Sequence, residues 1–267
     1  MIRALGLALA LGLALPAMAG PARVVSMNLC TDQLALMLAA PGQLVSVSYL
    51  SHDPATAPMV TDLPVNHGLA EEIYLLRPDL VLAGRYTTLT TVAMLRRLGI
   101  PVVVFDPESD FDGIRANLRR MGEVLNRAAQ AEAVVAQFDA DLAALPPPPR
   151  TRPRAALYSA NGYTSGDQSL AGQILAAAGY ANIATELGIP QGGILPVEQL
   201  VLAGPDLLIL GRRYPGAARA QEVLDHPAIA ALRQYAATGT MTDRDWVCGT
   251  PHILRAIRAV PPAGSLG

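Results

Sequence analysis

The sequence predicts an α/β protein of two lobes, each built on a parallel sheet, with a long helical segment between them. Three observations support this class. Short apolar strands alternate with amphipathic helices, the order that right-handed crossovers between parallel strands produce. A stretch of the first half recurs in the second half. Between the halves, apolar residues follow a helical period over residues 111–145.

Residues 1–19 have the features of a secretory signal peptide. Arg3 supplies a positive start, an apolar run follows, and Ala17-Met18-Ala19 has the Ala-x-Ala form of a cleavage site. The apolar run is shorter than the ~20 residues that a transmembrane helix needs. We therefore expect an exported, soluble, periplasmic protein.

The first lobe is predicted to span residues 20–108. Strands are expected where β-branched and other apolar residues concentrate, at 23–27, 44–48, 80–83 and 102–105. Helices are expected where the apolar residues follow a helical period, at 33–40, 70–76 and 88–98. The segment 49–67 contains three prolines and is predicted to be a loop.

Residues 109–149 are predicted to connect the lobes. Ser109 is the expected N-cap, with Asp112 as its return partner, and Pro146 to Pro149 end the helical pattern. One rigid helix over this stretch would be about 50 Å long. The alternative is a break near Gly122 or Asn126, which would give two stacked helices.

The second lobe is predicted to span residues 150–260. Its expected strands lie at 155–159, 207–210 and 238–242. Its expected helices lie at 168–178, 197–203, 217–224, 228–235 and 251–260. Residues 261–267 are expected to form a short flexible tail.

The two lobes share a sequence repeat. Glu71 and Glu198 each lie seven residues before a Pro-Asp pair, an apolar strand follows the pair, and a glycine lies six residues after the proline. Ser26-Met27-Asn28 likewise matches Ser159-Ala160-Asn161 at the end of a strand. The repeat indicates two related, Rossmann-like lobes. A ligand of such a protein lies between the lobes, beyond the carboxyl ends of the strands.

Composition and motifs exclude several classes of function. With 20 basic and 22 acidic residues and no basic runs, the chain is not suited to nucleic acid. It has no Gly-x-Ser-x-Gly, phosphate-loop or His-Glu-x-x-His motif, and its four histidines lack metal-ligand spacing. We expect no catalytic residues, no cofactor and no metal site built from protein side chains alone. Cys30 and Cys248 form a disulfide or two separate buried thiols, and a direct metal-ligand role for either is the third alternative.

The export signal, the two α/β lobes, the connecting helix and the paired Glu…Pro-Asp strands resemble the periplasmic metal-chelate-binding proteins of ABC importers. Those proteins carry iron siderophores, haem or vitamin B12. The resemblance covers the mature chain and implies a monomeric, non-enzymatic protein that delivers a metal chelate to a permease dimer. In that family a glutamate on each lobe docks against arginines of the permease, which assigns this role to Glu71 and Glu198.

Residues that follow strand ends are the candidates for the ligand cleft. Arginine offers a rigid fork to ligand oxygens, and tyrosine a flat face with a hydroxyl at its edge. The candidates at strand ends are Tyr49, Arg85, Tyr86, Arg213 and Tyr214, and Asn161 and Tyr163 in the first loop of the second lobe are candidates for a polar rim. Trp246 is a further candidate, which the resemblance alone implies. Tyr49 and Trp246 match positions where B12-binding relatives hold an aromatic residue.

One departure from the resemblance concerns the cargo. The tryptophan that B12-binding relatives carry just before the first docking glutamate is replaced by Asn66-His67. This departure disfavours cobalamin and leaves an oxygen-rich chelate or haem open. The alternatives to a chelate carrier are a protein that binds a metal ion directly and an exported α/β enzyme. Within a chelate carrier, His52 or His67 could reach the chelated metal from the cleft.

Overall fold

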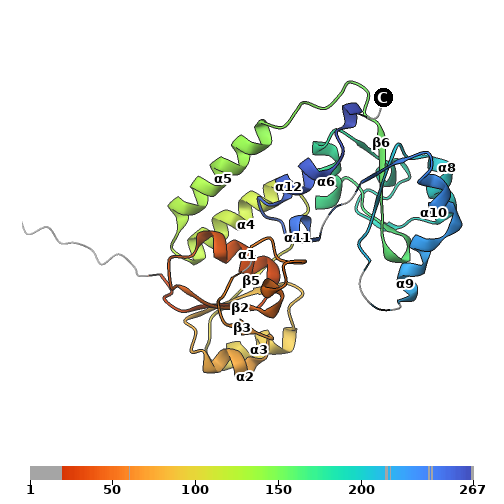
Figure 1. Cartoon of the computed structure of the whole chain (residues 1–267). Coiled ribbons are helices and arrows are strands. Elements are labelled where there is room, and N and C mark those ends of the chain that lie inside the picture. The colour runs from red at the N-terminus through yellow and green to blue at the C-terminus, as the bar shows by residue number, and fades with distance from the viewer. Residues whose placement is uncertain are drawn as a thin grey trace, which may run out of the picture.

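The structure is a computed structural model that describes residues 20–59, 61–213, 216, 218–239, 241 and 243–265. The predicted signal peptide at 1–19 lies outside the described residues. Figure 1 shows the two lobes, the N-terminal one in red to yellow and the C-terminal one in green to blue, with α5 running from the first lobe towards the second. The prediction of two α/β lobes with parallel sheets is therefore confirmed.

The N-terminal lobe is a five-stranded parallel sheet in the order β3-β2-β1-β4-β5. The strands are β1 (Val24–Ser26), β2 (Leu44–Ser48), β3 (Val65–Asn66), β4 (Leu80–Gly84) and β5 (Val102–Phe105). The helices are α1 (Leu29–Leu38), α2 (Ala70–Leu75) and α3 (Leu89–Arg97).

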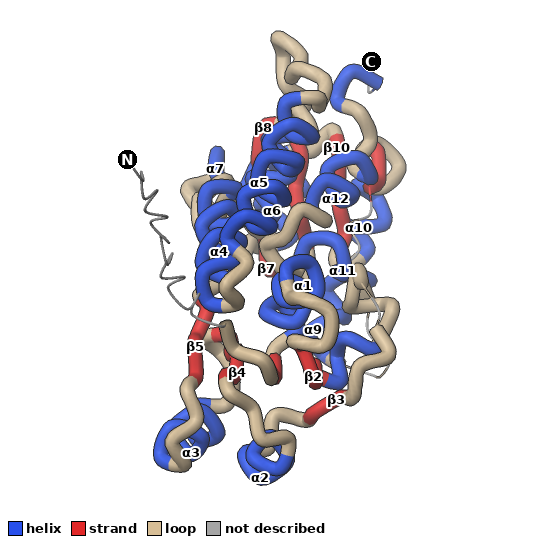
Figure 2. The backbone as a smooth tube through the Cα atoms, turned by 90° about the vertical axis from the view of Figure 1, so that its left-hand side faces the viewer, coloured by secondary structure: helices blue, strands red, loops and turns tan. Residues whose placement is uncertain are grey.

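Successive residues of β1 face opposite sides of this sheet, as the pleat requires. Val24 packs into the core with Leu34 of α1, whereas Val25 packs with Ile73 of α2 and Leu95 of α3. Figure 2 shows α2 and α3 together below the strands, on the far side from α1 and α4. Both faces of the sheet are covered, which explains why its strands are apolar runs.

The C-terminal lobe has a four-stranded parallel sheet in the order β11-β10-β6-β8 and a small antiparallel pair, β7-β9. The strands are β6 (Arg154–Tyr158), β7 (Tyr163–Thr164), β8 (Ala181–Asn182), β9 (Gly193–Ile194), β10 (Leu207–Leu210) and β11 (Ala237–Gly239). The helices are α6 (Leu170–Ala177), α7 (Ile183–Glu186), α8 (Val197–Ala203), α9 (Arg219–Glu222), α10 (Pro227–Leu232), α11 (Asp243–Trp246) and α12 (Ile253–Ala259). The apolar residues of α6 and α12 pack on one face of the sheet and those of α8 and α10 on the other.

The connecting segment is not one helix. It consists of α4 (Phe111–Val124) and α5 (Ala128–Ala143), which pair side by side through ion pairs from Arg119 to Glu132 and from Arg115 to Asp139. This order of contacts makes the two helices antiparallel. The prediction of a single long helix is therefore wrong, and the alternative of two stacked helices is correct.

Two residues account for the turn between α4 and α5. Asn126 adopts a left-handed conformation with φ of 56°, which ends the helical path. Gly122 lets the helices approach closely, since a Cβ atom there would lie 2.4 Å from Cβ of Ala131. The N-cap of α4 is Asp110, whose carboxylate accepts a hydrogen bond from the N–H of Gly113 at 2.7 Å, and not Ser109 as predicted.

Several short elements were not predicted. Strand β3 lies in the segment expected to be a loop, and β7, β8, β9, α7 and α11 are too short to show a period in the sequence. The first residues of the expected tail pack against the C-terminal lobe: Ala263 is buried, and the Tyr180 hydroxyl donates a hydrogen bond to the Pro261 carbonyl at 2.7 Å. Within the described ranges, the helices are all too short or too polar to cross a membrane.

The largest hydrophobic core runs through both lobes. It contains Leu82 of the first sheet, Phe138 of α5, Leu207 of the second sheet and Ile257 of α12. The two lobes and the helix pair are thus packed around shared apolar residues. Such packing opposes large movements of one lobe against the other.

Candidate functional site

A cleft of about 440 Å³ lies between the lobes. Its N-terminal wall is formed where β1, β4 and β5 end, and its C-terminal wall by β7, the start of α6 and the segment after α11. The residues that line it include Asn28, Cys30, Leu34, Arg85, Tyr86, Phe105, Asp106, Glu108, Tyr163, Ser165, Ser169, Leu170, Trp246, Val247 and Gly249. The cleft therefore lies at the carboxyl ends of the first sheet, where the topology places a ligand site.

Arg85 and Asp106 form an ion pair on the N-terminal wall. Arg85 follows β4 and Asp106 follows β5, and Nε of the guanidinium donates to Oδ1 of the carboxylate. The hydrogen bond raises the pKa of Arg85 and lowers the pKa of Asp106. Both side chains are exposed to solvent, so the ion pair contributes little to the stability of the fold. Its effect is to hold the Arg85 side chain at the cleft wall.

Glu108 joins the two walls. Its carboxylate accepts a hydrogen bond from the Asn117 amide and from the backbone N–H of Gly249. Burial raises the pKa of Glu108, and these hydrogen bonds act in the opposite direction. Gly249 is the residue that permits this contact, because a Cβ atom there would lie 2.4 Å from Oε2 of Glu108.

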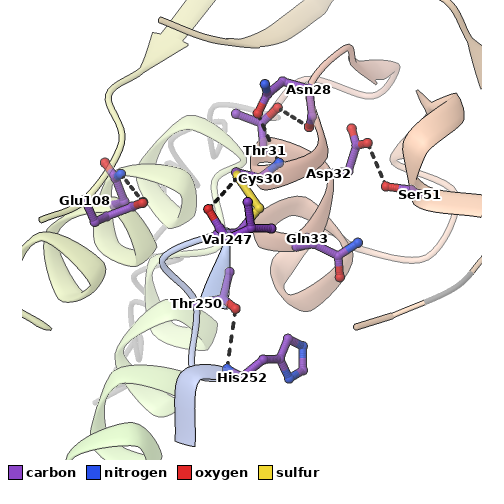
Figure 3. The surroundings of a disulfide bond; sticks show 12 residues. Asn28, Cys30, Thr31, Asp32, Gln33, Ser51, Glu108, Val247, Thr250 and His252 are labelled. Carbon is purple, nitrogen blue, oxygen red and sulfur yellow. Dashed lines mark hydrogen bonds between the residues drawn. A yellow bond between two sulfur atoms is a disulfide. The ribbon is translucent and has the colours of Figure 1, made fainter. Parts of the chain in front are cut away.

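A disulfide between Cys30 and Cys248 forms part of the same junction. Of the alternatives left open by the sequence, the structure contains the disulfide. Cys30 belongs to α1 of the first lobe and Cys248 follows α11 of the second, so the bond links the two lobes through cysteines that are 218 residues apart in sequence (Figure 3). Asn28 caps α1 by accepting a hydrogen bond from the N–H of Cys30 at 3.0 Å.

The cleft walls are mainly aromatic and apolar. Tyr163 projects from β7, and Trp246 ends α11; the indole nitrogen of Trp246 is buried and has no hydrogen-bond partner among the described residues. Leu34, Phe105 and Leu170 add apolar surface, and the charged residues of the lining are Arg85, Asp106 and Glu108. Flat side chains with few charges suit a large ligand that is mostly apolar.

Four predicted ligand residues lie in this cleft, namely Arg85, Tyr86, Tyr163 and Trp246. The other four are not among its lining residues. Asn161 lies in a 3₁₀ turn with a left-handed φ of 58°, Arg213 lines a second cavity and pairs with Asp225, and Tyr214 lies outside the described residues. A place after a strand end determines where the backbone of a residue lies, but not the direction in which its side chain points.

Tyr49, the remaining candidate, stacks on the ring of His67 with 5.5 Å between ring centroids. Tyr49 follows β2 and His67 follows β3, so the pair stands at the same edge of the sheet as the cleft wall. His67 is held in place by Glu72, which accepts the backbone N–H at 2.7 Å. His67 thus presents a flat ring just before α2, at the place where the B12-binding relatives carry a tryptophan.

Sequence reasoning missed Asp106 and Glu108, although a signal for both was present. Asp106-Pro107-Glu108 directly follows β5, so the rule that selected Arg85 applies to it equally. Ser165 and Ser169 had no comparable signal. Ser169 lines the cleft because it is the N-cap of α6, where its hydroxyl accepts a hydrogen bond from the N–H of Gly172 at 3.2 Å.

The two docking candidates are exposed and occupy equivalent places. Glu71 lies in the first turn of α2, which begins soon after β3 ends, and Glu198 lies in the first turn of α8. Burial and the nearby Glu198 carboxylate raise the pKa of Tyr158, the last residue of β6. Both glutamates therefore lie near the strand ends of their lobes. Among the described residues, no group of three or more His, Cys, Asp or Glu is placed to hold a metal ion.

Comparison with known proteins gives a family match over most of the chain. The family model described as periplasmic binding protein matches residues 24–247. A cobalamin-binding protein of Halobacterium salinarum is 31% identical over 202 residues, which is 72% of this chain and 54% of that protein. The chain thus spans about half the length of the curated relatives it matches.

Solved structures share the fold. The periplasmic haem-binding protein RhuT from Roseiflexus sp. RS-1 superposes with a TM-score of 0.71 at 23% identity, covering 89% of this chain and 95% of RhuT. The periplasmic haem-binding protein HutB of Vibrio cholerae gives 0.73 at 21% identity, covering 88% and 96%. The vitamin B12-binding protein BtuF of Vibrio cholerae gives 0.61 at 17% identity, covering 89% and 94%.

Proposed function

This chain belongs to the periplasmic binding protein family, a family of binding proteins and not of enzymes, and we propose that it captures a metal chelate between its lobes for an ABC importer. The observation that carries the proposal is the cleft at the junction of the two lobes. Its aromatic and apolar walls, at the carboxyl ends of the strands, are the surface that a large chelate needs. The signal peptide predicted at residues 1–19 supports capture in the periplasm.

Among iron siderophore, haem and cobalamin, we favour a flat macrocyclic cargo, either haem or cobalamin. The cleft lining includes one arginine, Arg85, which is already paired with Asp106, whereas an oxygen-rich anionic chelate calls for several cations. The rings of Tyr163 and Trp246 offer flat faces, and the stacked Tyr49–His67 pair adds another at the edge of the same sheet. The curated relative in Halobacterium salinarum is named as a cobalamin-binding protein, which supports the same class.

Delivery uses Glu71 and Glu198. Both carboxylates are exposed, neither forms an ion pair within the described part of the chain, and each lies in the first turn of an equivalent helix. Two separated negative charges fix the orientation of a partner that carries two positive sites. We assign that partner as the pair of permease subunits of the importer.

The fluorescence of Trp246 tests cargo binding, because the chain contains one tryptophan and its ring lines the cleft. Cyanocobalamin, haemin and a ferric trihydroxamate are titrated in turn, with N-acetyltryptophanamide correcting for absorption of light by each probe. We expect saturable quenching by cyanocobalamin or haemin at one site. The Trp246→Phe variant, followed by calorimetry, shows whether the cargo still binds when the reporter is absent.

Quenching by the ferric trihydroxamate alone would replace the macrocycle by a siderophore and keep the rest of the proposal. Binding of free Fe³⁺ or Co²⁺ as tightly as their chelates would favour direct metal-ion binding instead. Failure of all three chelates to bind would remove the cleft as a chelate site.

A further inference from the structure

Two leucines at matching positions of the sequence repeat are largely exposed on α2 and α8. Leu75, the last residue of α2, is 77% exposed, and Leu202, near the end of α8, is 86% exposed. A leucine side chain in water forgoes the free energy that its burial would release. A single exposed leucine needs no explanation, but these two occupy matching positions of the sequence repeat.

Each leucine lies four residues after a docking glutamate. Leu75 follows Glu71 and Leu202 follows Glu198 at this spacing, within helices that begin with those glutamates in the first turn. Residues four apart are neighbours on one face of a helix. Each lobe therefore presents a carboxylate and, one turn further along the same helix, an apolar side chain.

Exposed apolar residues of the helices gather on the outer layer of each lobe. In the described part of the chain, α2, α3 and α8 carry the large exposed apolar residues Tyr74, Leu75, Leu89, Met94, Val201 and Leu202. The long helices α4 and α5 have no large exposed apolar residue in that same part. The contrast shows that exposure of leucine is not a general feature of the helical surface of this protein.

We infer that Leu75 and Leu202 are apolar anchors that insert into the permease, one into each of its two subunits, beside the cation that meets the neighbouring glutamate. The inference rests on the proposed function, since it names a second element of the same docking surface. A duplicated surface on one chain fits a partner made of two related subunits. A hydrophobic side chain next to a charge gives affinity, while the charge gives orientation.

A second copy of this chain is a poor occupant of the same surface. Pairing α2 or α8 with its counterpart in another copy would bring Glu71 or Glu198 close to a like charge, which opposes association. A partner that offers a positive side chain and an apolar hollow at each contact can bind both the glutamate and the leucine of each helix.

Photocrosslinking in cells that express the chain with its own importer tests the contact. Benzoylphenylalanine replaces Leu75, Leu202, Glu71, Glu198 or, as a control, the exposed Gln137 of α5. We expect crosslinks to the permease subunits from the four positions on α2 and α8 and none from position 137. Crosslinks from positions 71 and 198 without any from 75 and 202 would overturn the leucine contact and leave the docking glutamates in place.

Affinity for the importer in lipid nanodiscs gives the size of the effect. Leu75→Gln and Leu202→Gln should each weaken binding about tenfold, and the pair roughly a hundredfold, because each removes one leucine from the interface. Leu187→Gln, which removes an exposed leucine at the end of α7, is the matched control and should leave affinity unchanged. Affinity unchanged in the double variant, or crosslinks from position 75 or 202 to a second copy of the chain, would overturn the inference. Absence of permease crosslinks from all four positions would remove the proposed docking itself.

Discussion

Removing the disulfide tests how far the lobes act as one unit. The Cys30→Ser, Cys248→Ser double variant replaces only the two sulfur atoms and breaks the covalent link between α1 and the segment after α11. The bond joins two cysteines that are 218 residues apart in sequence, so it closes a very long loop. A loop of that length restricts the unfolded chain strongly, and its loss should lower stability mainly through the entropy of that state.

Loop-closure entropy at this separation corresponds to about 5 kcal/mol at 25 °C. This value is comparable to the whole unfolding free energy of many domains, roughly 5–15 kcal/mol. For a chain of this size it lowers Tm by roughly 10–20 °C. The shared core that joins Leu82, Phe138 and Leu207 makes unfolding of both lobes cooperative, so the full effect should appear in one transition.

Guanidinium unfolding of the oxidised wild type and the double variant, followed by circular dichroism, measures the difference. Reduction of the wild type with dithiothreitol provides an independent route to the same state and should reproduce the shift of the variant. A stability loss below 1 kcal/mol, or two separate transitions in the oxidised protein, would refute the view of the lobes as a single linked unit.

Three further predictions concern docking, pH and movement. Glu71→Ala combined with Glu198→Ala should abolish uptake in whole cells and leave chelate affinity unchanged; a loss of affinity would remove the docking assignment. Burial raises the pKa of Asp32 from 3.8 to about 7, so the folded state keeps a proton that the unfolded chain releases, and stability should fall as pH rises from ~4 to ~7. Asp32→Asn should flatten that fall in chemical unfolding measured at pH 5 and pH 8, and an unchanged slope would show that Asp32 does not cause it. Small-angle scattering should show little compaction on chelate binding, because Cys30–Cys248 and the shared core hold the lobes; a large change in radius of gyration would contradict this.

The central strands of both sheets were predictable because they are buried on both faces. Strands β4, β5 and β10 are runs of apolar residues between turn signals, the pattern that is typical of parallel strands covered on both faces. The helix α8 was equally clear, since it repeats the pattern of α2. Short pairs such as β7 and β9 depend on contacts between distant segments, and no local pattern specifies them.

The hairpin of α4 and α5 shows where periodicity fails. Ile114 and Leu118 of α4 and Val135 and Phe138 of α5 enter the same core, so the apolar stripe continues across the turn as it would in one straight helix. The turn depends on the close approach at Gly122 and the left-handed Asn126, both of which fit inside a helical pattern. The helical period of the apolar residues therefore cannot by itself distinguish one long helix from a helical hairpin.

The most direct test of the central claim, that the cleft between the lobes holds the cargo, is calorimetric titration of wild type and a variant with a blocked cleft. Val247→Trp places a large ring at an exposed position of the lining, and Leu187→Trp adds the same ring at an exposed position that is not part of the lining. With the probe that quenches Trp246, we predict one site in the wild type and in Leu187→Trp, and at least tenfold weaker binding in Val247→Trp. Equal affinity in all three proteins would contradict the account, because the cargo would then lie somewhere else.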